Sequence, residues 1–140
     1  MSWQDILKQH ISYSGVVLDK ASRNTLLELD IPEDWKHFAH HMTITMGALV
    51  HPKGKHDYSE NYPLGEEIVL ELVGVGKDDK VMAVKVKPPA SISPKISFPH
   101  ITVAVNTEGG GKPFHSNKLS SENFKPISGT LKGIVTEVSQ

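Results

Sequence analysis

Two histidine–threonine pairs are the residues of this sequence best suited to chemistry. The first pair is His41 and Thr43, in the run AHHMTITMG. The second is His100 and Thr102, in the run FPHITVAVN. Histidine titrates near neutral pH, so one imidazole can accept a proton while another donates one, and a threonine hydroxyl can hold a phosphoryl oxygen. The pairs therefore suit in-line displacement at a phosphodiester, where the attacking and leaving oxygens lie on opposite sides of the phosphorus.

Both pairs lie in segments expected to form β-strands, in which side chains alternate between two faces. In the first strand the two faces carry, respectively, His41, Thr43 and Thr45, and Met42, Ile44 and Met46. In the second strand they carry His100, Thr102 and Ala104, and Ile101, Val103 and Val105. We expect the apolar faces to pack in the core, the polar faces to meet at one site, and His40 to face away from it. A half-buried histidine with a satisfied hydrogen bond is the alternative for each pair.

Local patterns predict a single α+β domain over residues 1–140, with a largely antiparallel sheet and two or three helices. Strands are expected at 13–19, 37–50, 66–76, 80–87, 100–106 and 128–138, and helices at 3–9, 22–30 and near 118–124. Ser22 is expected to be the N-cap of the second helix. The segments 51–65 and 107–118 are rich in glycine, proline and polar residues and predict long loops.

The composition is that of an ordinary globular protein, and it excludes several kinds of site. The formal net charge of −1 over 140 residues provides no basic field, which favours a small ligand over a nucleic-acid duplex. The absence of cysteine excludes disulfides, thiolate zinc sites and a cysteine nucleophile. The run MSWQDILKQH indicates neither a signal peptide nor a membrane span. We therefore expect a cytoplasmic protein with a small ligand.

The two His-x-Thr pairs resemble the signatures of the 2H phosphoesterase superfamily, which is named for its two H-x-T/S motifs. Members of that superfamily are two-lobed α+β proteins in which each lobe contributes one motif to a central cleft. They cleave 2′,3′-cyclic phosphates and related phosphodiesters without a metal or other cofactor. The resemblance covers roughly residues 13–138. Over residues 13–47, from YSGVVLD to WKHFAHHMTITMG, the chain is most similar to the phage anti-CBASS nucleases, which degrade cyclic oligonucleotide signals of bacterial immunity.

The resemblance implies a metal-independent phosphodiesterase that cleaves 3′–5′ linkages in cyclic di- or trinucleotides, in the cytoplasm of a bacterial host if a phage encodes it. It also implies that Tyr13 stacks on a base and that Glu137 contacts a base edge. Ordinary packing of Tyr13 and a solvated charge at Glu137 are the alternatives. Two other functions stay open: an RNA 2′,3′-cyclic phosphodiesterase, and a protein that sequesters cyclic nucleotides without turnover.

The long loops contain further polar and aromatic residues that could bind a ligand. His51 and His56 would suit a zinc site, but no well-placed Asp, Glu or Cys completes one, so we expect no metal. Lysines that could attract a phosphate, or remain solvated loop charges, are Lys53, Lys55, Lys112 and Lys118. Loop aromatics that could stack on a base, or simply pack, are Tyr58, Tyr62 and Phe114.

Overall fold

The computed structural model describes residues 11–96 and 98–139, so the helix expected at 3–9 lies outside the described residues. The strands are β1 (Ile11–Leu18), β2 (Lys36–His37), β3 (His41–Met46), β4 (Glu67–Lys77), β5 (Val81–Lys87), β6 (His100–Val105), β7 (Phe124–Pro126) and β8 (Thr130–Ser139). The helices are α2 (Lys20–Leu27) and two 3-10 helices, η1 (Pro113–Lys118) and η2 (Ser121–Asn123). Within the described residues, no helix is long and apolar enough to cross a membrane.

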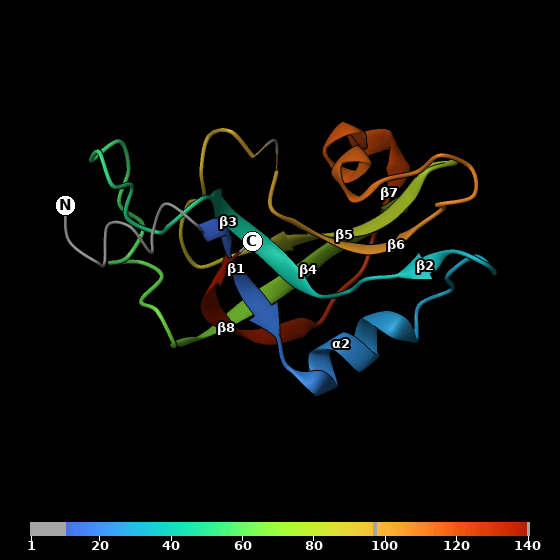
Figure 1. The fold of residues 1–140 in the computed structure, drawn as a ribbon. Coiled ribbons are helices and arrows are strands. Elements are labelled where there is room, and N and C mark those ends of the chain that lie inside the picture. Colours follow the sequence, from blue (N-terminus) through green and yellow to red (C-terminus); the bar gives the residue numbers. More distant parts are fainter. Residues whose placement is uncertain (1–10, 97, 140) are drawn as a thin grey trace.

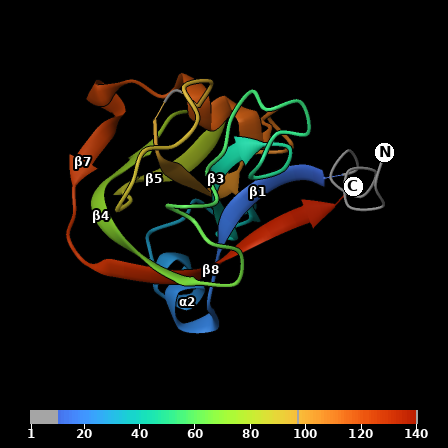
Figure 2. The same ribbon diagram turned by 90° about the vertical axis from the view of Figure 1, so that its left-hand side faces the viewer.

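The strands form one antiparallel sheet that closes on itself. Its order is β2-β6-β3-β1-β8-β4-β5, and β5 also pairs with β6, so six strands make a closed ring. Figures 1 and 2 show these strands curving around a shared interior, with α2 on one side of the ring. The expected α+β class and largely antiparallel sheet are confirmed, and the hairpin expected at 66–87 is β4 and β5.

Two apolar clusters hold the ring together. The interior cluster takes fully buried residues from successive strands, among them Val16, Met42, Leu70, Val84, Ile101 and Leu131. The second cluster lies on the opposite face of β5 and β6, where Val81, Ala83 and Val105 pack with Leu119 from the segment after η1. Burial of these side chains is the main favourable term for the fold. Of the two motif strands, β6 therefore has apolar residues packed on both faces, and the second cluster holds η1 beside it.

An extra residue in β3 changes the alternation expected from the sequence. On β1, Gly15 pairs with Thr43 and the next residue, Ser14, pairs with Thr45, so Ile44 forms a β-bulge. Beyond the bulge the two faces exchange. Thr45 is buried, whereas Met46 is 59% exposed. The expectation that Thr45 shares the face of His41 and that Met46 packs in the core was therefore wrong.

β6 contains a bulge at the equivalent position. On β5, Ala83 pairs with Thr102 and Met82 pairs with Ala104, so Val103 is the extra residue. Ala104 consequently packs in the interior cluster, and Val105 belongs to the second cluster. The sequence had placed these last two residues of β6 on the opposite faces.

The strand expected at 37–50 is broken into β2 and β3. The segment between them contains Ala39, whose φ of 49° is unusual for a residue other than glycine. Backbone bonds continue across the break, since the N–H groups of Phe38 and Ala39 donate to Val103 and Thr102. β3 then ends before Gly47, which has a φ of 82° that glycine adopts without steric cost.

Asp19, not Ser22, is the N-cap of α2. The Asp19 carboxylate accepts the backbone N–H of Ser22 at 2.8 Å. The Ser22 hydroxyl is buried and accepts the backbone N–H of Lys132 at 2.7 Å, which fastens the helix to β8. Ser22 is therefore used in packing the helix on the sheet, and the expected cap was wrong. The short helix expected near 118–124 is the 3-10 helix η2, whereas η1 lies in the segment over 107–118 that was expected to be a loop.

Candidate active site

The two motif strands meet at the shortest seam of the ring. β3 and β6 share a single register pair, Met42 with Ile101. In an antiparallel pair, the residues on either side of a paired position lie opposite each other in reverse order. This register sets His41 level with Thr102, and Thr43 level with His100. Each histidine therefore lies across from the threonine of the other motif.

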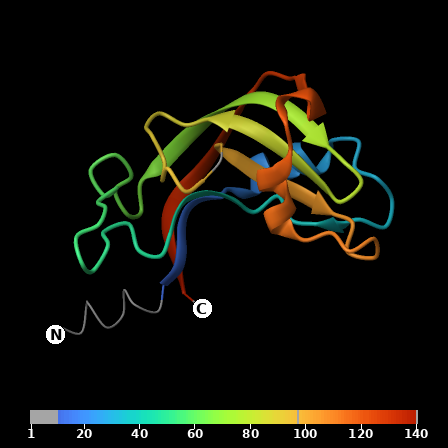
Figure 3. The same cartoon turned by 90° about the horizontal axis from the view of Figure 1, so that it is seen from above.

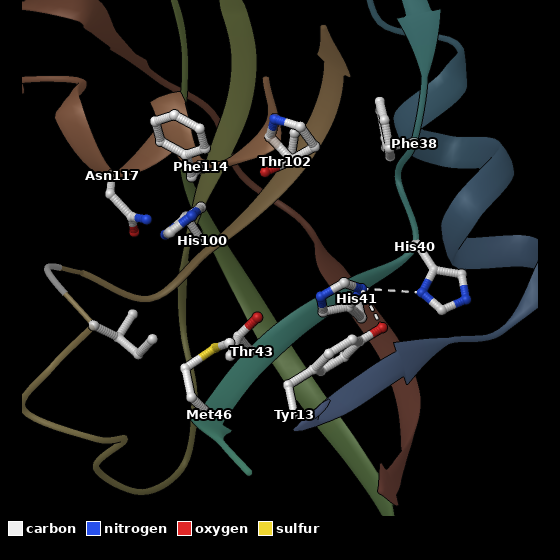
Figure 4. Close-up of a pocket in the computed structure, with 12 residues that line it drawn as sticks. Tyr13, Phe38, His40, His41, Thr43, Met46, His100, Thr102, Phe114 and Asn117 are labelled. Carbon is white, nitrogen blue, oxygen red and sulfur yellow. Dashed lines mark hydrogen bonds between the residues drawn. The ribbon is translucent and has the colours of Figure 1, made fainter. Parts of the chain in front are cut away.

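A pocket of about 260 Å³ opens over this seam. Its lining comes from β1, the segment before β3, β3, β6 and η1, together with Ile96. The lining residues are Tyr13, Phe38, His40, His41, Thr43, Met46, Ile96, His100, Thr102, Pro113, Phe114 and Asn117. Figure 4 shows the two histidines and two threonines alternating around the pocket. The expectation that the polar faces of the two strands meet is therefore confirmed.

His41 is held by two side chains. Its ring stacks on Tyr13 with centroids 4.4 Å apart, and its Nδ1 lies 3.3 Å from the Tyr13 hydroxyl. The same Nδ1 lies 3.0 Å from Nδ1 of His40. Since both contacts involve Nδ1, the other nitrogen, Nε2, is left for the pocket (Figure 4). His40 therefore lines the pocket, contrary to expectation, because the chain is not extended at Ala39.

A glycine on β1 makes room for this arrangement. A Cβ at Gly15 would lie 2.7 Å from the carbonyl oxygen of Met42 and 3.4 Å from Cδ2 of His41. Such a contact with backbone is too short, so any larger residue would force β1 and β3 apart. Gly15 thus allows the close strand approach on which the position of the His41 ring depends.

The pKa of His41 is lowered to about 4, first by burial and then by the positive charges of His40 and His100. The ring is therefore neutral at pH 7. The His100 charge therefore lies near enough to lower the proton affinity of His41. A bound anion between them would oppose these effects and favour the protonated form.

His100 is held by the backbone instead. Its Nδ1 lies 2.7 Å from the carbonyl oxygen of Phe98, and its ring packs on the Phe98 ring. A carbonyl only accepts, so Nδ1 carries the proton and Nε2 of the neutral ring has a free lone pair. Burial lowers the pKa of His100, and the bond to Phe98 partly opposes that shift. His100 is thus oriented as a proton acceptor.

The two threonines also differ in their surroundings. The Thr102 hydroxyl lies 2.7 Å from the hydroxyl of Ser116, a buried residue of η1. The Thr43 hydroxyl has no hydrogen-bond partner among the described residues. Thr102 therefore joins β6 to η1, while the Thr43 hydroxyl is available to a ligand.

The two predicted substrate-binding residues have different positions. Tyr13 lines the pocket, with one face of its ring covered by His41. Glu137 is not among the lining residues, and its carboxylate accepts the backbone N–H of Leu49 at 3.1 Å. In this structure the glutamate holds the loop that follows β3. Contact of either residue with a base remains a prediction.

Sequence reasoning missed Asn117 and the exposed Met46, and it left Phe114 as one of several loop aromatics. Asn117 and Phe114 come from η1, which the second apolar cluster and the Thr102–Ser116 bond hold over the pocket. Met46 reaches the pocket because of the bulge at Ile44. No local signal in the loop over 107–118 indicates this placement.

Comparison of the chain with protein-family models, curated proteins and solved structures finds no match in any of the three. Within the described residues, no group of three or more His, Cys, Asp or Glu side chains is placed to hold a metal ion.

Proposed function

We propose that this chain is a metal-independent phosphodiesterase that cleaves 3′–5′ linkages in cyclic di- or trinucleotides. The observation that carries the proposal is the arrangement of two histidines around one pocket, each opposite the threonine of the other motif. A phosphorus between the two imidazoles would have a proton acceptor on one side and a proton donor on the other. The threonine hydroxyls would donate to its non-bridging oxygens.

In the proposed reaction the ribose 2′-oxygen attacks the adjacent phosphorus and the bond to the 5′-oxygen breaks. His100 takes the proton of the 2′-hydroxyl, since the Phe98 carbonyl orients its Nε2 lone pair toward solvent and substrate. His41, protonated in the presence of the phosphodiester anion, gives its Nε2 proton to the departing 5′-oxygen. The Nδ1–H of that imidazolium has two possible acceptors, Nδ1 of His40 and the Tyr13 hydroxyl. Attack by a neighbouring hydroxyl gains the advantage of an intramolecular reaction.

The first product carries a 2′,3′-cyclic phosphate. Water then attacks the phosphorus with His41, now neutral, as the base, and the 2′-oxygen leaves with the proton that His100 acquired in the first step. A terminal monophosphate remains, and both histidines return to their starting states. Each proton that one ring releases is thus matched by one that the other takes up, and no further reactant besides water is needed.

The rim of the pocket supports a nucleotide as the ligand. Met46 is 59% exposed and Phe114 is 54% exposed, and both line the pocket (Figure 4). Large apolar side chains exposed at the edge of a polar pocket are a common mark of a binding site. A base that stacks on an aromatic ring contributes about 1–3 kcal/mol. Phe114 also has the Lys118 ammonium 5.8 Å from its ring centre, where it would attract a phosphate.

The ring can also be divided in a way that supports the two-lobed form of the 2H superfamily. The strands β8, β1 and β3 would make one half, and β4, β5 and β6 the other. Each half would then contribute one His-x-Thr strand, and the seam between the motif strands would correspond to the central cleft of that superfamily. The cytoplasm of an infected bacterium, where immune cyclic oligonucleotides occur, is the location that this function requires.

Chromatography of the products formed from a panel of cyclic di- and trinucleotides, with and without EDTA, tests the proposal. We expect linear products from at least one cyclic ligand, with equal rates in both conditions. RNA with a 2′,3′-cyclic end belongs in the same panel, and cleavage of that substrate alone would assign an RNA-end phosphodiesterase. Recovery of intact cyclic ligand after heat release would assign a sequestering protein. Loss of activity with EDTA that zinc or magnesium restores would overturn metal independence.

A further inference from the structure

A cluster of three lysines and two histidines lies beside the candidate active site, on the loop that follows β3 and on the loop before β6. We call it the cationic hollow, and it consists of His51, Lys53, Lys55, His56 and Lys95. The loop before β6 is joined to β3, since the Ser93 N–H donates to the Ile44 carbonyl, and residues of both loops line one depression. Figure 3 shows the first of these loops projecting from the ring on the side away from β2.

The lining of the hollow carries an excess of basic side chains. Within the described part of the chain, no Asp or Glu lines either of the two depressions that contain these residues. Desolvation, followed by the charges of His56, Lys55, Lys53 and Lys95, lowers the pKa of His51 below its ordinary value. Positive charge around His51 therefore disfavours its protonated form, and an anion among these side chains would oppose that effect.

The loop that carries the hollow has a defined backbone. His51 N–H donates to the His56 carbonyl at 2.9 Å, and Val50 forms a bridge with Asp57. His56 Nε2 donates to the Ala48 carbonyl at 2.8 Å, and Glu137 accepts the N–H of Leu49. Several hydrogen bonds therefore fix the backbone of this loop, so binding an anion requires little further ordering of it.

Met46 connects the hollow to the catalytic pocket. Its side chain lines the pocket of the two histidines and also both depressions of the hollow. Met46 is therefore an exposed apolar side chain that lies between the pocket of the two histidines and the cationic hollow. A nucleotide chain has a similar alternation, because the nucleoside between two successive phosphates carries a base with an apolar face.

We propose that the cationic hollow is a second phosphate subsite, which binds the phosphate of the nucleotide next to the cleaved linkage while that nucleotide lies over Met46. The inference rests on the proposed function for the identity of the first site. It narrows the substrate class to oligonucleotides with at least two phosphates. A 2′,3′-cyclic mononucleotide would fill the catalytic pocket alone and gain nothing from the hollow.

Equilibrium binding of two uncleavable DNA fragments tests the subsite without depending on turnover. The dinucleotide d(ApA) has one phosphate and the trinucleotide d(ApApA) has two. We expect the native protein to bind the trinucleotide about tenfold more tightly at low salt, since phosphate contacts dominate such affinities. The triple variant Lys53→Gln, Lys55→Gln, Lys95→Gln should lose that difference and bind d(ApA) as the native protein does.

A matched variant separates a local subsite from the general effect of removing three charges. Lys77→Gln, Lys87→Gln, Lys125→Gln makes the same change on β4, β5 and β7, where the three exposed lysines line none of the depressions around Met46. This variant should keep the tenfold difference. Equal affinities of the native protein for the two fragments, or an equal loss in both triple variants, would overturn the subsite.

The binding experiment distinguishes failure of the second phosphate subsite from failure of the proposed phosphodiesterase activity. A native protein that shows the tenfold difference but cleaves no cyclic ligand would retain the subsite and lose the enzyme. A native protein that cleaves cyclic ligands without the difference would retain the enzyme and lose the subsite. For a cleaved cyclic dinucleotide, the triple variant at the hollow should raise KM about tenfold and leave kcat unchanged.

Discussion

The strands β3 and β6 present the same motif in the same backbone form, but they support it differently. In each strand the residue after the threonine is a bulge, Ile44 on β3 and Val103 on β6. The bulge lets each strand direct its histidine and threonine to the pocket and then turn the second residue after the threonine, Thr45 or Ala104, away from it. The supports of the histidines are unlike, because His41 contacts two side chains and His100 contacts a backbone carbonyl.

This difference explains how one motif can serve two roles. A carbonyl accepts and never donates, so it keeps a proton on Nδ1 of His100 and leaves Nε2 as an acceptor. The partners of His41 can change, since an imidazole nitrogen and a phenol each donate or accept. His41 can therefore gain and lose a proton while its ring stays in place. The backbone geometry aims the two histidines alike, and their hydrogen-bond partners make them chemically unequal.

Removal of either histidine should have the largest effect. His41→Ala and His100→Ala should each lower turnover of a cyclic dinucleotide by at least about a hundredfold, because each removes one proton-transfer group. His37→Ala, an exposed position on β2, is the control and should keep native activity. Near-native turnover in either test variant, with an unchanged circular dichroism spectrum, would contradict the two-histidine mechanism.

A sulfur leaving group should then separate the acid from the base. A cyclic dinucleotide with sulfur in place of the scissile 5′-oxygen releases a thiolate, which needs no proton donor. A general acid contributes at least about a hundredfold to the rate. We therefore expect His41→Ala to cleave this substrate at a rate within about tenfold of that of the native protein. His100→Ala should stay inactive, because the 2′-hydroxyl still requires a base. The reverse pattern would exchange the two roles.

Acid should destabilise the fold through His41. The pKa of His41 is lowered to about 4 in the folded state, so the unfolded chain binds more protons between about pH 4 and 6.5. The free energy of unfolding therefore falls as the pH is lowered through that window. Between pH 7 and pH 4.5 the His41 contribution is about 2 kcal/mol.

Urea denaturation at the two pH values measures this effect. His41→Gln should reduce the loss of stability between pH 7 and pH 4.5 by about 2 kcal/mol, the amount assigned to that ring. His37→Gln should leave the loss unchanged, since that side chain is exposed on β2. An identical pH dependence in His41→Gln and the native protein would show that the ring is not held in its neutral form.

The sequence was sufficient to predict the α+β class, the antiparallel sheet and the convergence of the two His-x-Thr pairs, because strand alternation determines which side chains share a face. It was insufficient to predict which face each residue after the threonine occupies. Ile44 and Val103 are ordinary strand residues, and a bulge depends on the register with a partner strand that lies far away in sequence.

The remaining parts of the site depend on tertiary contacts. His40 was expected to face away, and it reaches the pocket only because Ala39 adopts a positive φ between two strands. Phe114 and Asn117 reach it because Leu119 is buried in the second cluster and Ser116 bonds to Thr102. None of these causes has a local pattern, so a single sequence predicts the catalytic pairs better than the walls around them.

The threonines provide the smallest expected effect and the finest test of the asymmetry between the strands. Thr43→Val and Thr102→Val should each lower turnover by roughly tenfold, since each removes one hydrogen bond to the phosphoryl group. Only Thr102→Val should also lower the free energy of unfolding, by about 1 kcal/mol, because it leaves the buried Ser116 hydroxyl without its partner. Ser116→Ala breaks the same bond while keeping the Thr102 hydroxyl, so it should match the loss of stability with a smaller loss of turnover. Equal destabilisation by both valine substitutions would mean that η1 is not fastened through Thr102, and the contrast between the two motif strands would then lie in the histidines alone.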